Sequence, residues 1–397
     1  MSNWNRFAGH TALTALAIAL AAPAAIHAQE TTGTIRGQIA SAGAAIANAE
    51  VIITHVPSGS RAVARTDETG QFASSGLRPG GPYTVAVSAA NFQGATVNDV
   101  FLSAAEPFAL TLNLEAAADR VERVVVTASA VGRNRVDGTS TGLRRDRIEA
   151  IVAPGRDIRE LARQSPLVTQ NTVGDGGISI AGSNPRTNRI TIDGVAAQDD
   201  FGLNTGGLPT RRGPISLDAV SQFNVTPAPF DVRNGGFLGG AIDIVLRSGD
   251  NDFGGSVFGN FLSNDLTGSS INNVKVSNEV EQTNYGATFR GPILRDRLFF
   301  ALSYEKFEGS DTTNRGPIDG GQFANTIVGP LGNPMTLADI SAVTSVFATT
   351  YGSNYPVGSI PGSKPILDEK YSIRLDWNIT DRQRASFTYR NAESTSL

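Results

Sequence analysis

The sequence predicts a mainly β protein in three parts: an N-terminal immunoglobulin-like β-sandwich, a mixed α/β domain, and the first strands of an antiparallel outer-membrane β-barrel. One observation is the stretch 371–379, Tyr-Ser-Ile-Arg-Leu-Asp-Trp-Asn-Ile, in which apolar and polar residues alternate strictly. A period of two indicates a β-strand with one apolar and one wet face. The other is that tight turns and long loops alternate between the C-terminal strands, which is typical of outer-membrane barrels.

The first 28 residues have the pattern of a secretion signal. Arg6 supplies a positive charge, residues 12–25 are apolar and rich in alanine, and Ala28 ends a candidate cleavage site. A membrane anchor is the alternative, but the apolar stretch is shorter than the roughly 20 residues that a spanning helix needs. We therefore predict export and a mature chain that begins at Gln29.

Composition narrows the possible chemistry. The chain has 397 residues, enough for two or three domains, and its net charge of -4 gives no reason to expect a nucleic-acid partner. It has no cysteine, and cleavage after Ala28 would leave only His55 of its three histidines. The absence of cysteine excludes disulfides and Cys–His metal sites. A Ser-His-Asp triad would have His55 as its one candidate base. We predict no enzyme activity, no catalytic or metal-binding residue and no cofactor.

Residues 31–114 are predicted to form the β-sandwich. Short β-prone stretches alternate with turn signals, such as Asp-Glu-Thr-Gly at 67–70 and Pro-Gly-Gly-Pro at 79–82. Several short strands at regular spacing indicate a sandwich.

Residues 115–141 are predicted to be a linker, rich first in alanine and later in glycine, serine and threonine. This linker contains a β-prone pentad: Val124, Val125, Val126, Thr127 and Ala128. One interpretation is a further strand of the sandwich. The other is a peptide that adds to the sheet edge of a partner protein, where backbone hydrogen bonds supply the affinity. Composition leaves both open.

Residues 142–248 mix helical and strand patterns. Their arginines could attract an anionic substrate, but we favour ion pairs that seat this domain against acidic residues of the barrel wall. The glycine-rich stretches lack the Gly-Lys-Ser/Thr of a phosphate loop, and Asp250 and Asp252 lack calcium-loop spacing, so turns are favoured. The arginines are Arg144, Arg145, Arg147, Arg186, Arg189, Arg211 and Arg212.

From residue 254 onward the pattern is one of long alternating strands. We predict strands at 256–262, 283–291, 297–307, 370–379 and 384–390, joined by tight turns at 292–296 and 380–383 and by long loops at 264–282 and 309–369. The wet register, including Glu305, Arg374, Asp376 and Arg390, should face the lumen. The register expected to face lipid comprises Leu298, Phe300, Leu302, Tyr304, Ile373, Leu375, Trp377, Phe387 and Tyr389.

Taken in order, these stretches resemble TonB-dependent outer-membrane receptors of the Oar-like group. Residues 31–114 resemble a carboxypeptidase regulatory-like domain, a name that implies no activity. The pentad from Val124 to Ala128 is similar to a TonB box. Residues 178–195, 227–231 and 239–242 resemble a plug domain, and residues 290–300 resemble a first periplasmic hairpin.

The resemblance implies energy-coupled uptake of a ligand across the outer membrane of a Gram-negative cell. Its partners would be TonB with its inner-membrane energising complex, outer-membrane lipid, and an unknown siderophore, oligosaccharide or peptide. TonB would bind Val124, Val125, Val126, Thr127 and Ala128. The alternative is a non-transporting surface or adhesion protein that uses the sandwich as its binding module, and only transport needs the pentad.

Two features depart from the family. Many plugs carry Ile-Arg-Gly where this chain has Ala181 between isoleucine and glycine, so a charged contact with the wall is expected to be missing there. Transporters of this type have barrels of about 22 strands, of which five are predicted here, and Leu397 is not the terminal aromatic of such barrels. We therefore expect the N-terminal part of a longer receptor, with too few strands to close a pore by themselves.

Overall fold

The computed structural model describes residues 31–104, 107–117, 124–127, 140–171, 176–199, 206–228, 238–266, 270–271, 274–275, 281–312, 315–319, 325–326, 332–352, 363–380 and 383–396. The predicted signal sequence lies outside these residues. No helix in the described part of the chain is long and apolar enough to cross a membrane.

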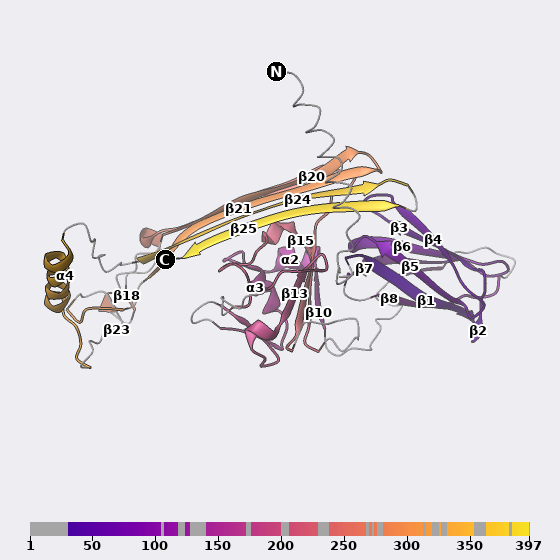
Figure 1. Cartoon of the computed structure of the whole chain (residues 1–397). Helices are drawn as coiled ribbons and strands as arrows, with labels where there is room; N and C mark the ends of the chain where they lie inside the picture. Colours follow the sequence, from indigo (N-terminus) through magenta and orange to yellow (C-terminus); the bar gives the residue numbers. More distant parts are fainter. Residues whose placement is uncertain are drawn as a thin grey trace, which may run out of the picture.

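The three predicted parts occupy separate regions of the molecule (Figure 1). A long curved sheet covers a central α/β domain, and the N-terminal sandwich lies beside the central domain at one end of the long sheet. Helix α4 (Leu337–Tyr351) lies at the opposite end. Residues far apart in sequence therefore meet where the sandwich, the central domain and the long sheet come together.

The N-terminal sandwich consists of two sheets. The first has the order β2-β1-β5 with β8 parallel to β1, and the second has the order β4-β3-β6-β7-β9. Their inner faces enclose a core that includes Ile35, Val51 and Val85, all fully buried. The strands are β1 (Gly33–Ser41), β2 (Ala44–Ala45), β3 (Glu50–His55), β4 (Arg61–Arg65), β5 (Gln71–Leu77), β6 (Gly80–Ser88), β7 (Ala95–Leu102), β8 (Phe108–Asn113) and β9 (Val124–Thr127).

The central domain is built on a five-stranded sheet of order β10-β15-β16-β13-β14. Helices α2 (Arg145–Ala150) and α3 (Ile158–Ala162) bury Ile148 and Leu161 in its core. The sequence pattern predicts a helix over residues 155–164, but the helix that forms is shorter because Asp157 caps it, accepting a 2.9 Å hydrogen bond from Arg159 N. The strands are β10 (Thr141–Arg144), β11 (Val168–Gln170), β12 (Ile178–Ile180), β13 (Arg189–Ile192), β14 (Val195–Ala196), β15 (Val220–Thr226) and β16 (Ala241–Leu246), with 3₁₀ turns η1 (Pro185–Thr187) and η2 (Leu217–Ala219).

The long sheet is an antiparallel meander of order β17-β20-β21-β24-β25. All five predicted strands are present, but four extend further at their loop ends, where pairing continues as far as Thr312 with Ser363. Its strands are β17 (Gly254–Leu262), β20 (Gln282–Leu294), β21 (Leu298–Thr312), β24 (Ser363–Asn378) and β25 (Arg384–Ser396). Among the described residues β17 and β25 do not pair with each other, so this sheet is an open part of a barrel.

The connections at the loop end contain structure that the sequence did not predict. Helix α4 (Leu337–Tyr351) lies in the long connection and begins with a capping box between Thr336 and Asp339. The short elements there are η3 (Asn264–Leu266), β18 (Ser270–Ile271), β19 (Val274–Lys275), β22 (Arg315–Gly316) and β23 (Asn325–Thr326).

Burial along the long sheet confirms the predicted register. Glu305 and Asp376 are fully buried on the face that meets the central domain, whereas Trp377 and Phe387 are 49% and 59% exposed on the other. One expectation needs correction: because Ser372 belongs to the wet register, the sequence predicts that Ser372→Arg costs little stability, but Ser372 is buried on the inner face, with its hydroxyl 2.6 Å from that of Ser303. An arginine at position 372 would therefore crowd its neighbours and destabilise the sheet.

His55 provides a pH-dependent element of the sandwich. Burial is the main cause that lowers its pKa to about 3, followed by the charge of Arg78. Because the folded pKa lies below the ordinary value of 6.5, the neutral imidazole stabilises the fold above that value, and this stabilisation is lost as the pH falls toward 3. We expect hydrogen exchange at the amides of Val51 and Val85 to show a less stable sandwich at pH 5 than at pH 7. In His55→Gln this difference should shrink, and an unchanged difference would assign it to other groups.

Candidate functional site

The pentad is part of the sandwich. Strand β9 (Val124–Thr127) runs parallel to β7, with Val124 paired to Ala95 and Thr127 paired to Asn98. Just before it, Gln93 N donates to Glu115 O and Ala117 N donates to Asn91 O, so the chain joins this sheet edge before β9 begins. Ala128 lies outside the described residues. The interpretation as a further strand of the sandwich is therefore confirmed for Val124–Thr127.

Strand β9 nevertheless keeps one free edge. It is the last strand in the order β4-β3-β6-β7-β9, so β7 lies on one side and no described strand lies on the other. A strand at a sheet edge presents unpaired N–H and C=O groups to which another chain can add. The second interpretation, a peptide offered to a partner, therefore requires a partner that either adds to this edge or takes the place of β7 beside β9.

A chain of buried charges joins all three parts of the molecule. Arg374 Nη1, on β24, donates to Asp193 Oδ2 of the central domain at 2.8 Å. Arg374 Nε donates to Asp376 Oδ2 at 2.9 Å, and Arg78 Nε of the sandwich lies 3.5 Å from Asp376 Oδ1. Ser386 Oγ, on β25, donates to the same Asp376 oxygen at 3.0 Å. We call Arg78, Asp193, Arg374 and Asp376 the junction cluster.

A second group of charges seats the central domain against the wall. Arg212 lies 3.6 Å from the fully buried Glu305, and its guanidinium carbon is 3.9 Å from the centre of the Phe307 ring. Lys370 Nζ donates to Gly213 O at 2.8 Å and lies 2.9 Å from Asp368. Charged side chains thus reach across the interface from both the central domain and the wall.

The predicted arginines have different roles. Arg212 forms the expected ion pair with the wall, whereas Arg145 pairs with Glu149 at 2.6 Å within its own helix. Arg144 lies over the ring of Phe101 in the sandwich, 4.9 Å from its centre. Sequence reasoning missed Arg78 and Asp193 of the junction cluster. In the sequence Asp193 indicates only a turn, because Gly194 follows it, and nothing around Arg78 distinguishes it from a surface arginine.

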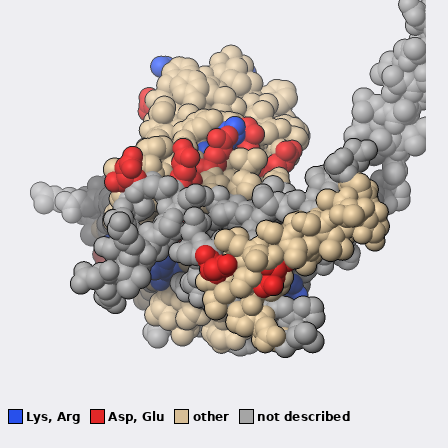
Figure 2. All heavy atoms as spheres, turned by 90° about the vertical axis from the view of Figure 1, so that its left-hand side faces the viewer, with Lys and Arg blue, Asp and Glu red and all other residues tan. Residues whose placement is uncertain are grey.

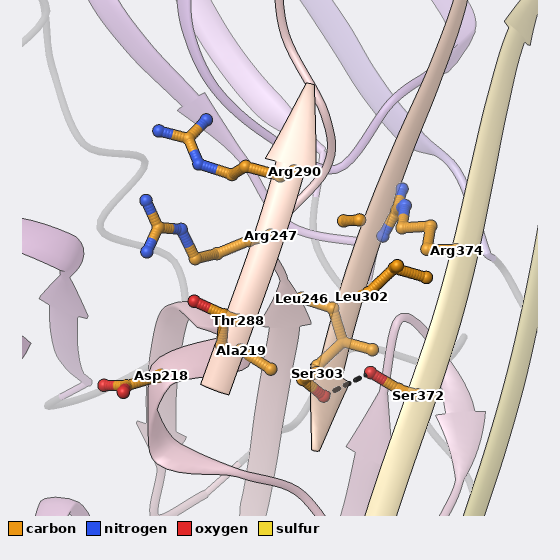
Figure 3. Close-up of a pocket in the computed structure, with 11 residues that line it drawn as sticks. Asp218, Ala219, Leu246, Arg247, Thr288, Arg290, Leu302, Ser303, Ser372 and Arg374 are labelled. Carbon is orange, nitrogen blue, oxygen red and sulfur yellow. Dashed lines mark hydrogen bonds between the residues drawn. The ribbon is translucent and has the colours of Figure 1, made fainter. Parts of the chain in front are cut away.

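Two cavities lie beside the charged residues that join the central domain to the wall and to the sandwich. One of about 20 Å³ lies between the central domain and the wall, with Arg247 and Arg290 on one side and Arg374 on the other (Figure 3). This volume holds about one water molecule. Burial is the main cause that lowers the pKa of Arg247 to about 10, followed by the charge of Arg290. A larger cavity of about 390 Å³ lies at the junction cluster, between Arg78, Asp193, Arg374, Arg384 and Arg390.

The sandwich also contacts the tight-turn end of the long sheet. Asn251 N donates to Pro57 O at 3.2 Å, and Arg384 Nη2 donates to Arg61 O at 2.7 Å. Asn251 Nδ2 donates to Asp296 Oδ1 at 2.8 Å. Nearby, Asp250 Oδ1 accepts from Asp252 N at 3.0 Å, and Asp250 forms an ion pair with Arg290. This is the geometry of the hinge turn that the sequence predicts.

His55 does not form a catalytic site within the described residues. Its Nδ1 lies 2.7 Å from Ser58 Oγ, which superficially resembles a base and its nucleophile. Ser58 is fully buried and His55 is only 2% exposed, so a substrate could not reach either group. The pair instead fixes the loop between β3 and β4.

Comparisons with known proteins match two parts of the chain. Residues 34–115 match the carboxypeptidase regulatory-like domain, and residues 245–397 match an outer membrane beta barrel domain. Over 233 residues, 53% of this chain, the sequence is 29% identical to the TonB-dependent transporter Oar of Myxococcus xanthus. The chain is a homologue of TonB-dependent transporters over about half of its length. The match covers 21% of the length of that relative.

Solved structures of outer-membrane receptors resemble the chain at low identity. The siderophore receptor PirA from Acinetobacter baumannii is 18% identical, with a TM-score of 0.43, and the match covers 65% of this chain and 32% of that one. The outer membrane transporter YddB from Escherichia coli is 14% identical, with a TM-score of 0.44 and coverage of 65% and 33%.

The matched domains place the chain in the outer membrane. One register of the long sheet is exposed and the other is buried toward the central domain, as expected for residues that face lipid and lumen respectively. The relatives are transporters and receptors rather than enzymes.

A charge on the lipid face should be costly. We expect Leu375→Arg to destabilise the receptor by roughly 2–4 kcal/mol if the position is near the bilayer midplane. Thr388→Arg is the matched control, because Thr388 pairs with Arg374 in the lumen-facing register and is exposed. Reversible unfolding from lipid vesicles in urea measures both changes. Equal losses would show that both faces of this sheet are buried.

Proposed function

We propose that this chain belongs to a receptor that takes up a ligand across the outer membrane with energy supplied through TonB. The homology to a TonB-dependent transporter carries the proposal. The order of the parts supports it, since a β-prone segment precedes a central domain that packs on the lumen face of a barrel wall. In this proposal TonB binds Val124, Val125, Val126, Thr127 and Ala128, and the junction cluster resists movement of the central domain until force is applied.

The charge of the loop end bears on the ligand. Acidic side chains gather at the end of the molecule that carries α4 (Figure 2). Glu308, Glu369 and Glu393 belong to the paired strand ends there, and Asp339 lies at the start of α4. A surface of one sign attracts ligands of the opposite sign and repels those of the same sign. A neutral or cationic ligand is therefore favoured over a strongly anionic one.

Whole-cell accumulation tests the proposed function. Cells that lack their own receptors would be given labelled probes of three classes, a ferric siderophore, an oligosaccharide and a peptide. At least one probe should accumulate inside cells that contain both the receptor and TonB, and it should only bind at the surface when TonB is deleted. Surface binding without accumulation in either strain would favour the adhesion alternative.

A further inference from the structure

The pairing of β9 with β7 has a mechanical consequence. Strand β9 belongs to a sandwich sheet, whereas β10 lies at the edge of the central sheet, where β15 is its only partner among the described strands. The 13 residues 128–140 separate the two strands in sequence. While β9 stays on β7, tension applied to β9 is borne by the sandwich. Tension reaches β10 only after β9 has left the sandwich.

The sandwich is well placed to bear such tension. Arg78 is buried against Asp376 of the wall, and Arg384 of β25 donates to Arg61 O. The sandwich is therefore fixed to the barrel wall. A pull on β9 in its paired state would be borne by the sandwich and the wall and would not be transmitted along the chain to β10.

The β7–β9 ladder is suited to exchange. It has four residue pairs, compared with six between the parallel strands β1 and β8. Parallel pairing is slightly less stable per residue than antiparallel pairing, and among the described strands β9 has a neighbour on one edge only. A partner strand that pairs along the whole pentad can therefore replace the contacts that β9 makes with β7.

We propose that the edge of β7 is a holding site for the pentad, which competes with TonB for β9 and keeps the pentad out of the force path until TonB displaces it. This proposal rests on the proposed function, because it assumes that TonB binds the pentad. It adds a role for the carboxypeptidase regulatory-like domain: the domain holds β9 in the resting receptor and takes it back after transport.

Because the chain has no cysteine, engineered disulfides can test the holding site without background. The double variant Asn98→Cys/Thr127→Cys places thiols at residues that are paired across the two strands. The matched control is Asp99→Cys/Thr127→Cys, because a shift of one residue turns the side chain to the opposite face. We expect the paired variant to cross-link at least several-fold faster than the control. Equal rates would overturn the pairing of β9 with β7.

Binding of the purified periplasmic domain of TonB then tests the competition. The oxidised paired variant should bind it at least tenfold more weakly than the same protein after reduction, and the reduced protein should bind like the unmodified receptor. Equal binding by the oxidised and reduced forms would overturn the holding site while leaving TonB binding intact. No binding by the reduced form or by the unmodified receptor would overturn the proposed function itself.

Discussion

Replacing Val125 with proline will weaken the binding of TonB to the receptor. Proline removes one backbone N–H and fixes φ, so the pentad can no longer offer a continuous strand to a partner. We expect the Kd for the periplasmic domain of TonB to rise by roughly 10- to 100-fold, because one or two backbone hydrogen bonds between the strands and the strand geometry around them are lost. Isothermal titration with the purified receptor measures this change.

The matched control for this variant is Val125→Ile. It keeps the N–H and the preference for strand geometry, so binding should change little. Both variants should reach the outer membrane in normal amounts, because Val125 lies at the edge of the sandwich and not in the barrel. If Val125→Pro bound TonB as well as Val125→Ile does, the pentad would be only a strand of the sandwich and the adhesion alternative would gain support.

Replacing Arg374 with alanine will have the largest effect on stability. Arg374 is 4% exposed and holds Asp376 and Asp193, both through hydrogen bonds of 2.8–3.2 Å. Removing one partner of a buried ion pair leaves uncompensated charge and typically costs about 3–5 kcal/mol. We expect a loss of this size in the free energy of unfolding, together with faster hydrogen exchange at the β13–β14 turn, which Asp193 begins.

Arg65→Ala is the matched control for that loss. Arg65 pairs with Glu50 at 3.6 Å, but the arginine side chain is 61% exposed. Exposed ion pairs contribute about 0–1 kcal/mol, so the unfolding free energy should hardly change. Similar losses for Arg374→Ala and Arg65→Ala would show that the junction cluster does not hold the central domain to the wall.

Local patterns predicted most of the fold. Alternation over residues 371–379 indicated both the strand and its buried face, because a period of two assigns every second side chain to one side. The ends of the strands and the presence of helix α4 could not be predicted from such patterns. The loop ends of β21 and β24 are extended because these two strands pair with each other. Helix α4 buries none of its described residues, so no apolar stripe in its sequence indicates a helix.

Contacts between the three parts could not be predicted from the sequence. Arg78, Asp193 and Asp376 belong to three domains and meet only after those domains dock, so no local spacing connects them. The pentad shows the same limit. Its composition indicated a strand, but its pairing with β7 depends on the chain folding back along the sandwich edge at residues 115–117.

Cross-linking in living cells tests most directly whether TonB acts through β9. Val126→Cys would be the only thiol in these 397 residues, and it would be combined with a TonB that carries a single cysteine in its periplasmic domain. Ala44→Cys is the control, because Ala44 is exposed on β2, in the other sheet of the sandwich. We predict a TonB–receptor disulfide with Val126→Cys that increases when ligand is present, and little or none with Ala44→Cys. Equal cross-linking at both positions, or none at Val126, would contradict energy coupling through this strand.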